Sequence, residues 1–172
     1  MESRAKLFGH PIHPMLIPFP LGLLPTSVLF DVVYLLTGNG KWAEISFWMI
    51  AVGLAGGVAA TVFGAIDLER VPDGTRAKAV GIVHAVSAGG LMALFASSWL
   101  LRLGAPGGPG AIAIILSLLG IGLAVLTGWL GGELIARLGV GVSRGAHLNS
   151  PSSLSGRPAS EGEGSTDEQR RG

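Results

Sequence analysis

The strongest constraint on the fold is a series of four apolar stretches separated by short polar segments. They lie at about residues 15–36, 45–66, 79–101 and 111–132. Each has roughly 20 residues, and at a rise of about 1.5 Å per residue such a helix spans the roughly 30 Å hydrocarbon layer of a membrane. Because a backbone in lipid must satisfy its own hydrogen bonds, we expect four transmembrane helices rather than strands.

The composition supports a membrane protein and excludes several other classes. Hydrophobic residues make up 49% of the 172 residues and charged residues only 13%, whereas about a quarter of the residues in a soluble domain are charged. A net charge of +1 gives no reason to expect nucleic-acid binding. The absence of cysteine excludes disulfides, thiol catalysis, cysteine-ligated metal centres and c-type haem attachment.

The connections between the apolar stretches predict how the helices are arranged. Residues 37–44, 67–78 and 102–110 form short segments rich in turn-forming residues, so consecutive helices should be antiparallel neighbours. The predicted fold is an all-α, up-down-up-down four-helix bundle over residues 1–142. Residues 143–172 are rich in Ser, Gly, Arg and Glu, a composition that predicts a disordered cytoplasmic tail.

Two further features predict how the helices pack. Small residues that permit close helix contacts recur along one face of three helices. Prolines in the first apolar stretch predict a kink there. The small residues are Gly53, Gly57, Ala60 and Gly64; Gly81, Ala85, Gly89 and Ala93; and Gly120, Ala124, Thr127 and Gly131, and the prolines are Pro18, Pro20 and Pro25.

The distribution of basic residues predicts the orientation in the membrane. Four helices place both termini on one side, and that side has seven Lys and Arg residues near helix ends. The other side has only Lys41 and Arg102. The positive-inside rule therefore places both termini in the cytoplasm. The seven residues are Arg4, Lys6, Arg70, Arg76, Lys78, Arg137 and Arg144.

Histidines and acidic residues gather at the same cytoplasmic end of the predicted bundle. His10 and His13 begin the first helix, Asp67 ends the second, His84 lies near the start of the third, and Glu133 ends the fourth. Ionisable groups at membrane depth are costly unless they are paired, so each is a candidate functional residue. Imidazole and carboxylate are suitable ligands for zinc, iron or manganese, and the five residues form the predicted metal site.

A faint internal repeat suggests a more specific site. Each helical hairpin opens with a histidine and closes with an acid, His13 with Asp67 and His84 with Glu133. A parallel repeat about the membrane normal would set His13 and His84 on opposite sides of the bundle axis, as the two axial ligands of haem b require. We therefore predict cofactor binding by His13 and His84, with haem b or a transition metal as the cofactor.

A purely structural interpretation of these histidines is the alternative. His10 and His13 belong to a His-Pro-Ile-His-Pro segment that is suited to start a helix at the headgroup level. His84 would then form a hydrogen bond with Asp67 or with a free carbonyl near the kinked first helix.

Asp31 lies at the opposite end of the bundle. It is about 27 Å from His13 along the helix axis, so the two cannot share a site. We predict a structural ion pair of Asp31 with Arg102, with Lys41 as the alternative partner. A proton or ion path from Asp31 to the histidine cluster is a further hypothesis.

Several motifs are shared with a known family, over roughly residues 7–150. They are Gly9-His10-Pro11-Ile12-His13-Pro14-Met15, Pro18-Phe19-Pro20-Leu21-Gly22, Phe30-Asp31, Gly64-Ala65-Ile66-Asp67, Gly74-Thr75-Arg76-Ala77, His84-Ala85 and Gly128-Trp129-Leu130-Gly131-Gly132-Glu133-Leu134. In these motifs the chain resembles an uncharacterised family of bacterial four-helix membrane proteins, known as domain of unknown function 2231.

The resemblance implies a bacterial inner-membrane location and no established activity. Some members of the family are fused to cytochrome c-like domains, which favours a redox role. Relatives often have a histidine shortly after the final Glu-Leu motif, whereas residues 135–140 of this chain contain none.

Two classes of function stay open at this point. One is a redox module of the inner membrane that binds haem or a metal, with a redox partner. The other is a non-catalytic membrane subunit or assembly protein without a cofactor. Both imply contact with the lipid bilayer and allow a homo-oligomer, and neither involves nucleic acid. The sequence does not decide whether the protein is an enzyme or what His147 does.

Overall fold

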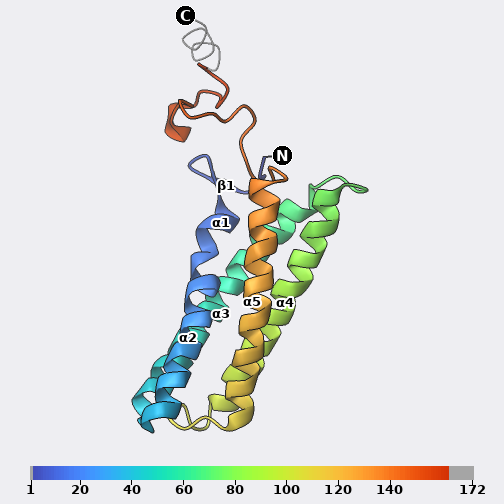
Figure 1. The fold of residues 1–172 in the computed structure, drawn as a ribbon. Coiled ribbons are helices and arrows are strands. Elements are labelled where there is room, and N and C mark those ends of the chain that lie inside the picture. The colour runs from blue at the N-terminus through green and yellow to red at the C-terminus, as the bar shows by residue number, and fades with distance from the viewer. Residues whose placement is uncertain (1, 163–172) are drawn as a thin grey trace, which may run out of the picture.

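The computed structural model describes residues 2–162 and confirms the predicted all-α bundle. Four long helices run in alternate directions (Figure 1). We call the end that holds the N-terminus the terminal end and the opposite end the loop end. The helices are α2 (Pro18–Thr37), which follows the short α1 (Ile12–Leu16), then α3 (Gly40–Glu69), α4 (Arg76–Arg102) and α5 (Ala111–Ala136).

Helices α3, α4 and α5 are longer than the apolar stretches that predicted them, because further residues, many of them polar, form their end turns. Asn39 caps α3 by accepting a hydrogen bond from the backbone N–H of Lys41, and Thr75 caps α4 by accepting one from Lys78. Gly38 ends α2 in the left-handed conformation, with φ of 67°. Polar end residues carry no apolar signal, so hydropathy detects only the central part of α3 and α4.

The predicted kink in the first helix is a break between α1 and α2. Ile17 still donates its backbone N–H to the carbonyl of His13, but Pro18 has no N–H to continue the ladder. Pro25 lies inside α2. The break makes α1 a separate five-residue segment that packs against α3 and presents His13 to that helix.

Each of the four helical segments is long and apolar enough to cross a membrane. Within the most apolar part of each, between 22% and 33% of the residues are buried inside the bundle. Most of the apolar surface therefore faces outward, which fits lipid rather than water as the surrounding medium.

The core of the bundle confirms the packing role of two of the three small-residue faces. Gly53 packs against Leu24 and Gly120 packs against Phe95, so closely that an added Cβ would collide with either side chain. The central apolar layer consists of Leu24, Val28, Ile50, Leu91, Phe95 and Ala124.

The predicted packing face of α4 is wrong beyond its first residue. Gly81 is buried, but Ala85, Gly89 and Ala93 are exposed. The buried face of α4 instead includes Ser87, which is two residues and about 200° around the helix from Gly89. Regular spacing of small residues shows which residues share a face, but it does not show which way that face points.

The N-terminal residues form a small hairpin that the sequence patterns did not predict. Strands β1 (Lys6–Leu7) and β2 (His10–Pro11) pair antiparallel, and the turn places Phe8 and Gly9 at φ of 50° and 82°. Two consecutive residues with positive φ are typical of tight hairpin turns.

The segment after α5 returns to this hairpin. Residues 143–162 contain turns and a short 3-10 helix, η1 (Ser153–Ser155), and the remainder of the predicted tail lies outside the described residues. The backbone N–H of Arg144 donates to Glu2. The hydrogen bond from Lys6 and this backbone contact hold the pKa of Glu2 below its usual value, because both stabilise the carboxylate.

Candidate functional site

His13 is held against α3 at the terminal end of the bundle. Its half-buried ring lies 2.7 Å, measured from Nδ1, from the backbone carbonyl oxygen of Ala60. The ring packs on Gly64, where a Cβ would lie 2.8 Å from Cε1 of the imidazole. Only a glycine leaves room for the ring in this position.

His84 makes the equivalent contact in the second hairpin. Its Nδ1 lies 3.1 Å from the backbone carbonyl oxygen of Thr127 on α5, and its ring lies over Gly131. In both hairpins the accepting carbonyl precedes the glycine by four residues. The internal repeat suggested by the sequence therefore extends to the environment of the two imidazoles. The structural interpretation expected His84 to bond Asp67 or a carbonyl of the first helix. The observed partner is instead a backbone carbonyl on α5.

These contacts determine the tautomer of both rings. A backbone carbonyl can only accept a hydrogen bond, so Nδ1 must carry the proton, and the lone pair of a neutral ring is then on Nε2. Within residues 2–162, neither Nε2 has a hydrogen-bond partner. The two rings come from different hairpins, and both lie toward the terminal end of the bundle. Two imidazoles thus offer unoccupied Nε2 atoms at one level of the bundle.

The other three residues of the predicted metal site, His10, Asp67 and Glu133, each bond a different partner. His10 is exposed and bonds Ser153 through Nε2. Across the described part of the chain, no three His, Asp or Glu side chains are grouped as metal ligands.

Each carboxylate is satisfied locally instead. Asp67 accepts hydrogen bonds from the hydroxyl of Ser3, at 2.7 and 2.8 Å, and from the backbone N–H of Arg4 at 3.1 Å. Glu133 forms an ion pair with Arg76 at 2.6 Å. Asp67 therefore anchors the N-terminal segment, and Glu133 joins the ends of α5 and α4.

The ion pair predicted at the opposite end is present and completely buried. Nη1 and Nη2 of Arg102 each lie 2.7 Å from a different carboxylate oxygen of Asp31. Both side chains are 0% exposed. The guanidinium and the carboxylate therefore form two parallel N–H···O hydrogen bonds, which is the strongest arrangement for an arginine–aspartate ion pair.

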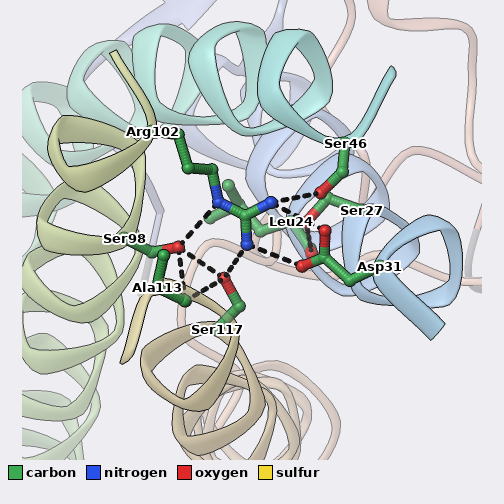
Figure 2. A network of polar contacts seen from close by, with 8 residues as sticks. All are labelled: Leu24, Ser27, Asp31, Ser46, Ser98, Arg102, Ala113 and Ser117. Carbon is green, nitrogen blue, oxygen red and sulfur yellow. Dashed lines mark hydrogen bonds and ion pairs between the residues drawn. The ribbon is translucent and has the colours of Figure 1, made fainter. Parts of the chain in front are cut away.

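Three serines complete the coordination of Arg102, as Figure 2 shows. The Nε–H donates to Ser98 at 3.2 Å, and the remaining N–H groups of Nη1 and Nη2 donate to Ser46 and Ser117, each at 3.3 Å. All five donors of the guanidinium therefore have acceptors. Asp31, Ser46 and Ser117 come from α2, α3 and α5, so the network joins all four long helices. The sequence analysis missed these serines, although hydroxyls within apolar stretches at the depth of Arg102 were a detectable signal.

An apolar layer separates the two polar regions. Near His84, the hydroxyl of Thr127 donates to that of Ser87, which donates to the backbone carbonyl of His84, and these hydrogen bonds continue no farther toward the loop end among the described residues. Ser98, which belongs to the Arg102 network, is about 16 Å farther along α4 than Ser87, and Leu91 and Phe95 are buried between them. No chain of side-chain hydrogen bonds connects the two regions through the part of the protein that the structure describes.

Comparison with known families agrees with this architecture. Residues 9–144 match the model of the family described as predicted membrane protein DUF2231. The chain belongs to this family. The match confirms the resemblance seen in the sequence motifs, and it covers α1 to α5 with both imidazoles and the buried ion pair. Neither a curated protein nor a solved structure matches the chain.

Proposed function

We propose that this membrane protein binds a b-type haem, which Nε2 of His13 and Nε2 of His84 would hold. The proposal rests on the hydrogen bonding that the two imidazole rings share. Each Nδ1 contacts a backbone carbonyl, and each Nε2 has no partner among the described residues. Donation of the distal N–H to a carbonyl is the usual way in which proteins orient a ligating histidine and raise its basicity.

The number of available ligands favours haem over a bare metal ion. A zinc site needs three or four protein ligands, whereas the described residues contain no group of three His, Asp or Glu side chains that could hold a metal ion. A haem supplies four equatorial nitrogens itself and needs only axial ligands from the protein. The residues present therefore fit a haem better than the five-residue metal site expected from the sequence.

A haem held by two imidazoles would supply one-electron transfer. The residues of this chain would hold its two faces, fix the ring orientations and surround it with apolar helices. Because the apolar layer interrupts the polar path to the ion pair, electron transfer agrees with the structure better than proton conduction. A redox partner would be required, and the protein would act as an electron carrier.

Spectroscopy of the purified protein tests this proposal. The protein is produced with haem supplied, extracted in mild detergent, and examined for a Soret band, haem stoichiometry and metal content. We expect one low-spin haem per chain, and we expect His13→Ala or His84→Ala to lose the haem or convert it to a high-spin form. His10→Ala and His147→Ala are matched controls that should keep the wild-type spectrum.

Two results would contradict the haem site. One is a folded, monodisperse protein that stays colourless with haem supplied, which would favour the non-catalytic membrane subunit. The other is a stoichiometric metal ion bound without porphyrin, which would favour a metal site at the two histidines.

The charge distribution supports an orientation with the terminal end in the cytoplasm of a bacterial inner membrane. Arg102 is buried and neutralised by Asp31, so Lys41 is the only exposed basic residue near the loop end in the described structure. Since the natural chain has no cysteine, Gly108→Cys and Gly74→Cys can be labelled separately in intact cells. We expect an impermeant thiol reagent to modify only the first, and the reverse pattern would refute the orientation.

A further inference from the structure

An open groove lies on the lipid-facing side of α2 and α3 near the loop end. Its volume is about 610 Å³, and it is lined by Leu23 of α2 and by α3 residues between Lys41 and Val52. The groove is far from the histidines, because Lys41 lies in the first turn of α3 and Ala60, the partner of His13, lies about 28 Å farther along that helix. It therefore concerns a separate binding function.

The groove changes from charged to apolar along its length. Lys41 and Glu44 lie at the end near the helix start, and Ile45, Met49 and Val52 continue toward the middle of the span. Lys41 and Val52 are about 16 Å apart along the axis. This order, charge at the membrane surface and hydrocarbon beneath it, matches a phospholipid lying parallel to α3.

The two charges at the mouth of the groove are exposed and unpaired. No hydrogen bond or ion pair is made by the side chain of Lys41 or Glu44 to any other described residue, although they are three residues apart on one helix face. Trp48, which is 60% exposed, lies one turn below them with its indole N–H also unpartnered. Tryptophan in this position is typical of the boundary between headgroups and acyl chains.

We propose that this groove binds one phospholipid with a zwitterionic headgroup that ends in a primary ammonium, the phosphoethanolamine type. Lys41 pairs with the phosphate and Glu44 accepts hydrogen bonds from the ammonium, so both unpaired charges are satisfied by one ligand. One acyl chain lies along Ile45, Met49 and Val52. An anionic lipid leaves Glu44 unpaired, and a trimethylated headgroup has no N–H to donate to it.

Native mass spectrometry of the detergent-purified, haem-free protein tests the proposal. Phosphatidylethanolamine, phosphatidylcholine and phosphatidylglycerol with the same acyl chains are added separately. We expect the wild type to retain phosphatidylethanolamine best, Lys41→Gln to weaken retention of all three, and Glu44→Gln to abolish the preference for phosphatidylethanolamine. Each loss should be about tenfold or more, since each removes a charge-assisted contact.

Glu69→Gln is the matched control, because Glu69 is an exposed acid at the other end of the same helix. It should leave both affinity and preference unchanged. Equal retention of the three lipids by the wild type, or a preference that persists in Glu44→Gln, would overturn the proposal. Neither result depends on whether the protein binds haem.

Discussion

Replacing Arg102 with methionine is expected to destabilise the protein by about 3–5 kcal/mol, because the change leaves the buried carboxylate of Asp31 without a counter-ion. Asp31 is 0% exposed and receives both of its charged contacts from Arg102. The three serines that accept from the guanidinium also lose a partner. The free energy of unfolding, measured by titrating detergent-solubilised protein with denaturing detergent, reports the loss.

The double variant Asp31→Leu with Arg102→Met separates the ion pair from simple packing. Removing both charges eliminates the unpaired carboxylate, so we expect the double variant to recover much of the stability lost in Arg102→Met. The matched control is Arg76→Met, which breaks a more exposed ion pair with Glu133 and should cost about 1 kcal/mol or less. A loss in Arg102→Met no larger than in Arg76→Met, or additive losses in the double variant, would contradict this account.

Replacing Gly64 with alanine is expected to weaken haem binding by about tenfold or more, without removing either ligand. The added Cβ would lie 2.8 Å from Cε1 and 2.9 Å from Nδ1 of His13. Because Gly64 lies within α3, its backbone cannot shift alone, and the imidazole must leave the carbonyl of Ala60. The dissociation constant, measured by haem titration and the Soret absorbance, reports the change.

A second measurement makes this prediction independent of haem. Nitrogen NMR of the histidine side chains in the haem-free protein should show the Nδ1–H tautomer of His13 in the wild type and its loss in Gly64→Ala. Gly131→Ala is a graded comparison, since its Cβ would lie 3.3 Å from His84 and the ring need move only slightly. Gly89→Ala, which projects into open space, is the matched control. An unchanged tautomer and unchanged haem affinity in Gly64→Ala would show that the ring does not need this position.

Residue types and topology predicted at which end of the bundle the candidate site lies, but not which residues belong to it. Helix order alone placed His13 and His84 at the same end of the bundle, as the structure shows. The same reasoning placed Asp67 and Glu133 beside them, yet Ser3 and Arg76 lie closer and bind these carboxylates. A helix end allows a side chain several directions, and the nearest donor determines which one it takes.

The glycines likewise have a spacing that the sequence shows and a role that only the tertiary structure shows. Gly64 and Gly131 were recognised as members of small-residue faces, which the sequence alone explained by helix packing. The structure shows that both make room for an imidazole, a role that depends on the neighbouring helix. On α4 the equivalent spacing pointed to a packing face that is in fact exposed at Ala85 and Gly89.

The amino-acid sequence by itself determined the number of membrane spans, their alternate directions and the approximate depth of each ionisable residue, because these follow from hydropathy and chain connectivity in a lipid layer. Only the tertiary structure decided the rotation of each helix about its own axis. That rotation selects Ser46, Ser98 and Ser117 as partners of Arg102, and it turns the two imidazoles to their carbonyls. It depends on how side chains from different helices fit together, which no single stretch of sequence contains.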